Sequence, residues 1–178
     1  MSITDVGFAG VRKIQLDPVR DERGSFVRFF CRRTFQDAGL NIEWPQTNFS
    51  HTFQKGAVRG LHFQDEPAAE TKLITCLSGA VYDVLVDISP SSSTFGQWRA
   101  YELSEASALA LYVPTGIAHG FQCLTDDCRM AYMMSCDYHA EAARGVHYND
   151  PDLSISWPLP VSRISNKDDA LPRLQALK

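Results

Sequence analysis

The stretch LITCLSGAVYDVLVDI, residues 73–88, has the clearest pattern in the chain. In residues 80–88 the side chains alternate between two faces, which is the period of a β-strand. Residues 73–77 are equally rich in apolar and β-branched side chains. The dipeptide Ser78-Gly79 lies between the two runs and is typical of a tight turn. We therefore expect two strands here, joined as a β-hairpin.

Similar runs lie on both sides of this pair. The other strands that we expect span residues 11–16, 25–30, 46–53, 58–64, 97–103, 108–113, 120–124 and 129–136. The sequence also predicts a polar loop over 20–24, an exposed loop over 64–71, a helical turn over 34–38 and a short helix beginning near Ser165. About eight to ten strands with so little helix between them indicate an all-β fold, an antiparallel sandwich or barrel.

The composition is that of a globular protein, and the 178 residues suit one domain spanning 1–178. The formal net charge of −4 gives no reason to expect nucleic acid or an anionic membrane as a partner. No apolar run reaches membrane-spanning length, and MSITDVGFAG lacks the pattern of a signal peptide. The five cysteines form no Cys-x-x-Cys pair, so we expect reduced thiols in a cytoplasmic protein.

The segment VRGLHFQ, residues 58–64, combines groups that are suited to catalysis. The imidazole of His62 is the side chain best suited to proton transfer near neutral pH. On a regular strand Arg59 would point away from His62, unless a bulge at Gly60 turned one of them. A core histidine beside a surface arginine is an equally good interpretation of this segment alone.

A second motif, PTGIAHGF, follows an apolar strand at residues 114–121. Pro-x-Gly-x-x-His resembles the second motif of the cupin jelly rolls, in which the histidine points into the mouth of the barrel. His62 and His119 have no clear third ligand, so we predict that the site holds no metal. The alternative for His119 is a packed turn residue.

Many further motifs, in order along nearly the whole chain, make the sequence similar to the dTDP-4-dehydrorhamnose 3,5-epimerase family. They are Asp21-Glu22-Arg23-Gly24, Gln46-Thr47-Asn48, Arg59 to Gln64, Lys72-Leu73, Gly79, Asp83-Val84, Phe95-Gly96, Pro114 to Phe121, Tyr132, Asn149-Asp150-Pro151, Ile155-Ser156-Trp157 and Ser165-Asn166-Lys167-Asp168. The resemblance implies a cupin-like jelly roll with short peripheral helices, a homodimer and a nucleotide-diphosphate 4-keto sugar as substrate. It also implies an isomerase of dTDP-rhamnose and lipopolysaccharide biosynthesis that needs no cofactor.

Epimerisation beside a ketone sets its own chemical requirements. The carbonyl of a 4-keto sugar acidifies the C–H bonds at C3 and C5, so that removing a proton gives an enolate. A proton is then returned to the opposite face. Such a site needs a base, an acid across the ring and a cation or donor at the enolate oxygen.

The family resemblance assigns these roles to residues that the chain retains. It makes His62 the base, Asp168 the carboxylate that orients its imidazole, Tyr132 the opposing acid and Lys72 the cation. The positions that match substrate-binding residues are Arg23, Gln46, Asn48, Arg59, His119 and Lys167. Among these, the guanidinium of Arg59 is suited to a diphosphate.

Each position also has a structural alternative. Asp168 lies three residues after Ser165 and could serve only as a capping-box residue of the last helix. The ring of Tyr132 shares a strand face with two methionines, which is the pattern of core packing. Lys72 ends a polar loop and could be merely solvated. Arg23 could be a turn residue, and Lys167 could be a surface lysine in the first turn of a helix.

Three residues depart from the family pattern, and the function has rivals. Arg28 and Ala143 stand where the family has glutamates that hold the nucleoside, and Met133 replaces a common lysine. These changes leave open which base, and which sugar, the substrate carries. The alternatives are a single-centre epimerase or isomerase on another nucleotide ketosugar, such as a CDP-linked one, a non-catalytic nucleotide-sugar binding protein, and a metal-dependent oxygenase.

Overall fold

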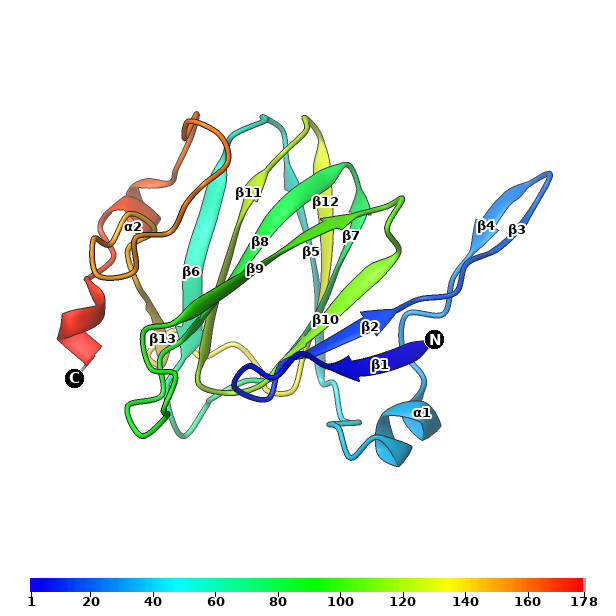
Figure 1. The fold of residues 1–178 in the computed structure, drawn as a ribbon, viewed down its shortest axis with the longest axis horizontal. Coiled ribbons are helices and arrows are strands. Elements are labelled where there is room, and N and C mark those ends of the chain that lie inside the picture. The colour runs from blue at the N-terminus through cyan, green and yellow to red at the C-terminus, as the bar shows by residue number, and fades with distance from the viewer. Residues whose placement is uncertain (178) are drawn as a thin grey trace.

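The computed structural model describes residues 1–177, and within them two antiparallel sheets pack face to face (Figure 1). The first sheet comprises, in order, β1 (Ser2–Asp5), β2 (Arg12–Gln15), β10 (Leu109–Val113), β7 (Lys72–Ser78), β12 (Cys128–Met134) and β5 (Gln46–Thr52). The second comprises β13 (Ala143–Gly145), β6 (Val58–Gln64), β11 (Ile117–Cys123), β8 (Ala80–Asp87) and β9 (Trp98–Ser104). This arrangement is that of a jelly roll, so the predicted fold class is confirmed.

The prediction of a β-hairpin at Ser78-Gly79 is wrong. β7 pairs with β10 and β12, whereas β8 pairs with β9 and β11, so the chain crosses from one sheet to the other here. Gly79 has φ +77°, and a Cβ on it would lie 2.6 Å from the hydroxyl oxygen of Thr125. The dipeptide does turn the chain, but pairing with strands distant in sequence decides which sheet each strand joins.

The core explains why residues 73–88 are apolar on both faces. Between the sheets, Val81 and Leu85 of β8 pack against Ile74 of β7 and its neighbours. On the outer face of the second sheet, Val84 and Val86 pack against the C-terminal part of the chain. Both faces of β8 are therefore buried, and the strand cannot lie at a sheet edge.

The N-terminal part differs most from prediction. The expected polar loop over 20–24 is part of a two-stranded hairpin, β3 (Val19–Asp21) and β4 (Gly24–Phe26), whose strands pair only with each other. The strand expected over 25–30 therefore ends at Phe26. Figure 1 shows this hairpin projecting away from the sandwich. The two short helices lie at the periphery, α1 (Arg32–Asp37) beside the first sheet and α2 (Asn166–Asp169) beside β6, followed by a 3₁₀ helix over Leu174–Leu177.

A bulge in β6 lies where the second sheet contributes to the cavity described below. His62 pairs with His119 of β11 and Arg59 pairs with Phe121, so three steps along β6 match two along β11. The extra residue falls beside Gly60, which has φ +111°. A Cβ there would lie 2.6 Å from the Cα of Gly120, so only glycine fits this crossing.

Replacing Gly60 with alanine should therefore destabilise the fold. We expect Gly60→Ala to lower the free energy of unfolding by about 1–3 kcal/mol, measured by urea denaturation. Gly24→Ala is the control, because Gly24 has φ +132° but nothing within 4 Å of an added Cβ. A loss for Gly60→Ala no larger than that for Gly24→Ala would mean that contact with Gly120 is unimportant.

Candidate active site

A cavity of about 630 Å³ opens at one end of the sandwich, between β5 of the first sheet and β6 of the second. This volume lies in the range typical of small-molecule sites. Nine of the ten predicted site residues line it. They are Gln46, Asn48, Arg59, His62, Lys72, His119, Tyr132, Lys167 and Asp168. The fold therefore brings together residues that are up to 122 positions apart in the sequence, from Gln46 to Asp168.

His62 and Asp168 form a hydrogen-bonded pair at the cavity wall. The Nε2 atom of His62 lies 2.8 Å from Oδ1 of Asp168, and the His62 side chain is 43% exposed whereas that of Asp168 is 7% exposed. The backbone N–H of Gly60 donates to Oδ2 of Asp168 at 3.1 Å. Burial by itself raises the pKa of Asp168, but hydrogen bonds from His62 and Gly60 and the charge of His62 outweigh it, so this pKa lies below its usual value.

Asp168 takes part in capping the last helix, but only through its backbone. Ser165 caps α2, and its hydroxyl accepts the backbone N–H of Asp168 at 3.0 Å. The carboxylate of Asp168 is turned instead toward His62 and Gly60. The backbone of Asp168 therefore begins the helix while its side chain serves the cavity.

Both Arg59 and His62 line the cavity, and the bulge at Gly60 makes this possible because a regular strand would point the two side chains in opposite directions. The Nε atom of Arg59 donates to the hydroxyl of Thr52 at 2.8 Å, and its Nη2 atom donates to the carbonyl of His51 at 3.2 Å. These contacts tie the guanidinium to β5, across the opening of the sandwich.

Tyr132 faces the cavity from β12, in the sheet opposite to His62. Its hydroxyl is 2.9 Å from that of Ser50 on β5, and its ring lies edge-on to His119. Burial raises the pKa of Tyr132 above its usual value, so the phenol stays protonated at neutral pH. The ring packs against the core between the sheets, as the structural alternative expected, and the hydroxyl is available to a ligand as well.

A second histidine–aspartate pair extends from the cavity wall into the core. His119 lines the cavity, and its Nε2 atom is 2.8 Å from Oδ2 of Asp83; the two side chains are 7% and 0% exposed. Burial raises the pKa of Asp83 above its usual value. Asp83 was given no role from the sequence, although an aspartate between Val81 and Leu85 on an apolar strand is a signal of a buried polar contact.

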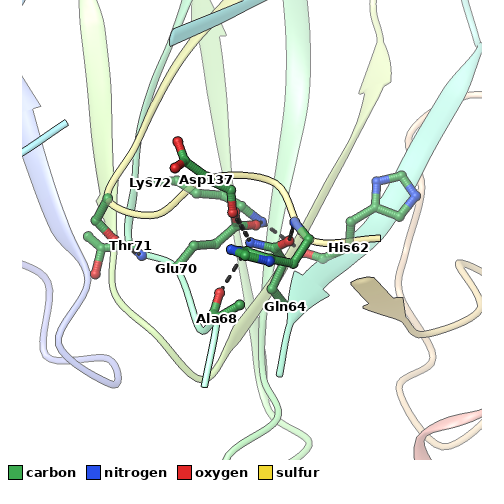
Figure 2. Close-up of polar contacts among 9 residues, drawn as sticks. His62, Gln64, Ala68, Glu70, Thr71, Lys72 and Asp137 are labelled. Carbon is green, nitrogen blue, oxygen red and sulfur yellow. Dashed lines mark hydrogen bonds and ion pairs between the residues drawn. The ribbon is translucent and has the colours of Figure 1, made fainter. Parts of the chain in front are cut away.

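Lys72 is buried rather than solvated, so the solvated alternative for it is wrong. Its side chain is 6% exposed, and Nζ lies 3.0 Å from Oε1 of Glu70. Nζ also donates to the backbone carbonyl of His62 at 3.0 Å. Figure 2 shows the ammonium between these two groups.

Of the remaining predicted residues, three line the cavity and one lies on the hairpin. Lys167 is exposed at the rim, whereas Gln46 and Asn48 line the wall from β5. Arg23 does not line the cavity: it lies on the projecting hairpin, its side chain is 84% exposed, and it pairs with Asp21 at 2.6 Å.

The three residues that depart from the family pattern lie in different parts of the structure. Ala143 lines the cavity, whereas Arg28 follows the hairpin and does not. Met133 packs on the outer face of the first sheet, against the cluster around Phe35. Of the three, Ala143 alone can face a ligand in the cavity of its own chain.

Residues 1–177 contain neither a ready-made metal site nor a membrane-spanning helix. In this range no group of three or more His, Cys, Asp or Glu side chains is arranged to hold a metal ion. Likewise, no helix in the part of the chain that the structure describes is long and apolar enough to cross a membrane.

The fold and the cavity together define a class of protein. An oriented imidazole on one sheet and a protonated phenol on the other line the same cavity, and a buried ammonium contacts the backbone carbonyl of the residue that carries the imidazole. These are the groups that an enzyme needs to remove a proton from one face of a carbon and return one to the other. The geometry is therefore that of an epimerase on a jelly-roll scaffold.

Comparison with known proteins agrees with this class. The family model for dTDP-4-dehydrorhamnose 3,5-epimerase matches residues 5–176. A relative of that name from Sinorhizobium fredii is 38% identical over 175 residues, which are 98% of this chain and 90% of the relative. The chain belongs to the dTDP-4-dehydrorhamnose 3,5-epimerase family, and it is an enzyme of the isomerase class.

Solved structures are equally similar. The Legionella pneumophila dTDP-6-deoxy-D-glucose-3,5-epimerase in complex with dTDP-4-keto-L-rhamnose has a TM-score of 0.93 and 37% identity, over 99% of this chain and 94% of that one. A 4-keto-6-deoxy sugar epimerase from the novobiocin biosynthetic gene cluster of Streptomyces spheroides has a TM-score of 0.94 and 35% identity, over 99% and 88%.

The position of His62 makes a direct prediction. In His62→Asn, exchange of the sugar C–H bonds with solvent should fall by about 10²–10⁴-fold, because a general base is typically worth that much. The measurement is deuterium wash-in followed by proton NMR, with a dTDP-linked 4-keto-6-deoxyglucose. His51→Asn is the control, since His51 pairs with Asp127 outside the cavity. Near-wild-type exchange in a folded His62→Asn protein would exclude His62 as the base.

Proposed function

We propose that the enzyme epimerises a dTDP-linked 4-keto-6-deoxyhexose at C3, C5 or both. The observation that carries the proposal is the placement of His62, paired with Asp168 of α2, on one sheet and of Tyr132 on the other, with both sheets lining one cavity. A nucleotide-sugar binding protein needs no such pair of opposed proton-transfer groups. The rim supplies Arg59 and Lys167, two cations suited to a diphosphate.

The proposed reaction has two proton transfers. His62 takes the proton from the carbon beside the carbonyl, and the electron pair moves to the carbonyl oxygen, giving an enolate near Lys72. Tyr132 then gives its phenolic proton to the opposite face of the same carbon, and the carbonyl forms again. The imidazolium loses its proton, and the phenolate regains one, by exchange with solvent. Asp168 stabilises the imidazolium between these steps.

The protonated phenol of Tyr132 is suited to the role of acid. A phenol is protonated at neutral pH, and burial raises the pKa of Tyr132 further, so Tyr132 holds its proton until the enolate forms. The hydroxyl of Ser50, 2.9 Å away, can donate to the phenolate that remains.

Three expectations about the rest of the protein belong to the same proposal. We take residues 1–178 to act as one catalytic domain. We also take the enzyme to be cytoplasmic, because its cysteines, Cys76, Cys123 and Cys128 among them, are free thiols. The reaction as written also needs no cofactor or metal ion. Activity that is lost on chelation and restored by one metal would contradict that last expectation.

We also propose a homodimer in which each hairpin completes the site of the partner. The hairpin strands lack neighbours, and Val19 and Phe26 on them are 69% and 72% exposed. Such apolar side chains gain most by burial against a second copy. Crossing to a second copy would bring Arg23 to a cavity that its own chain does not let it reach.

The phenol is tested by Tyr132→Phe, which removes one hydroxyl. We expect deuterium from solvent to enter the substrate on the His62 side while inversion falls by about 10²–10⁴-fold, since the acid alone is lost. Proton NMR measures both, and the number of positions labelled in wild type shows whether C3, C5 or both react. Tyr82→Phe is the control, because Tyr82 packs on the outer face of the second sheet. A normal yield of the epimer from Tyr132→Phe would exclude the two-faced mechanism.

Subunit exchange between two inactive variants tests the dimer. If Arg23 acts on the partner's cavity, mixing Arg23→Ala with His62→Ala should restore activity, because one site of each mixed dimer then has both residues. Subunits would be mixed after mild denaturation and refolding, and the mass checked by sedimentation. A mixture no more active than its parents would place Arg23 with the cavity of its own chain or outside catalysis.

A further inference from the structure

A buried polar cluster lies behind Lys72, in a segment that the sequence predicted to be an exposed loop. The side chain of Glu70 is 8% exposed, and Oε1 pairs with Nζ of Lys72 at 3.0 Å. The amide Nε2 of Gln64 donates to the other oxygen, Oε2, at 3.0 Å. Figure 2 shows Glu70 between the lysine and the glutamine, with both carboxylate oxygens in use.

We infer that Glu70 is a positioning residue for the reaction. Its carboxylate holds the Lys72 ammonium in the place where the enolate oxygen forms, and Gln64 holds Glu70 in turn. This inference rests on the proposed function, in which Lys72 faces the enolate. Neither Glu70 nor Gln64 touches the reacting atoms in this scheme, so both act through Lys72.

The directions of the lysine N–H bonds support the inference. An ammonium has three donors, and two of them are taken by Glu70 and by the carbonyl of His62. These two contacts fix the rotation of the group and leave one N–H bond for a ligand in the cavity, which Lys72 lines. The His62 contact also ties the cation to the strand that carries the proposed base.

The charge of Glu70 matters because Lys72 is buried. An ammonium that is 6% exposed has little water around it, so an anionic partner must take the place of that water. A glutamine at position 70 could not replace the carboxylate, because one end of an amide donates and only the other end accepts. It would present a donor either to Lys72 or to Gln64.

Gln64 connects this pair to the segment beyond β12. Its Nε2 atom also lies 3.1 Å from the carbonyl of Ala68 and 3.2 Å from that of Asp137, and its Oε1 atom accepts the backbone N–H of His139 at 2.7 Å. Three separate pieces of chain thus meet at one buried carboxamide. The position of the ammonium is therefore set by this framework rather than by the flexible lysine side chain.

A cation at the enolate oxygen acts mainly in the transition state, because the full negative charge is absent from the bound ketone. Glu70→Gln should therefore lower kcat while leaving the Kd for dTDP, measured by calorimetry, unchanged within twofold. We expect kcat to fall about tenfold, less than the 10²–10³-fold typical of losing a direct oxyanion donor. Glu66→Gln is the matched control, since Glu66 is an exposed glutamate of the same loop and should keep wild-type kcat.

A double-mutant cycle separates positioning from a general structural effect. In a Lys72→Met background, Glu70→Gln should cause no further loss of kcat, because the group that Glu70 positions is gone. The same tenfold loss in both backgrounds would overturn the inference. Wild-type kcat in Glu70→Gln, together with a lowered kcat in Lys72→Met, would also overturn the inference but leave the proposed function standing. Wild-type kcat in Lys72→Met would overturn the role of Lys72 itself.

A second variant keeps the test decisive if Glu70→Gln does not fold. Glu70→Asp retains the charge but withdraws it by one methylene, so it should also lower kcat without weakening dTDP binding. A folded Glu70→Asp protein with wild-type kcat would overturn the inference. Retained dTDP affinity serves as the check on folding in both variants.

Discussion

The close contact between Gly60 and Gly120 is the constraint on which the rest of the site depends. Because neither residue has a side chain, β6 and β11 can approach at the point where β6 takes up an extra residue. That bulge turns both Arg59 and His62 toward one cavity, and it aims the N–H of Gly60 at the carboxylate of Asp168. One backbone irregularity thus places the proposed base and the carboxylate that orients it.

The two-sheet architecture then separates the proposed acid from the proposed base. His62 comes from the second sheet and Tyr132 from the first, so the cavity lies between two groups that a single strand could not place on opposite sides of a ligand. Lys72 belongs to the first sheet but donates to the backbone of β6. The open end of a jelly roll is suited to this chemistry because both sheets contribute side chains to the same space.

The sequence predicted the composition of the site better than the course of the chain. Alternation was enough for an antiparallel sandwich or barrel, and the family resemblance that the motifs carry supplied the jelly roll and nine residues that do line one cavity. The hairpin at Ser78-Gly79 was wrong because a turn signal is local, whereas sheet membership depends on distant partners. Glu70 was assigned to an exposed loop because its burial comes from Lys72 and Gln64, a contact that no periodicity reveals. The position of Arg23 also depends on how the hairpin folds, which the polar composition of residues 20–24 did not indicate.

Two histidine–aspartate pairs each bring their histidine to the cavity, but the surroundings of the two aspartates differ. Asp168 accepts hydrogen bonds at both oxygens, and its pKa is lowered, so it remains a carboxylate that can stabilise an imidazolium. Asp83 is fully buried, its Oδ1 atom has no hydrogen-bond partner among residues 1–177, and its pKa is raised. A charged Asp83 is therefore disfavoured, whereas Asp168 remains a carboxylate beside His62. This difference between the two aspartates supports the proposal that His62 is the base, with His119 proposed only to form a hydrogen bond to the substrate.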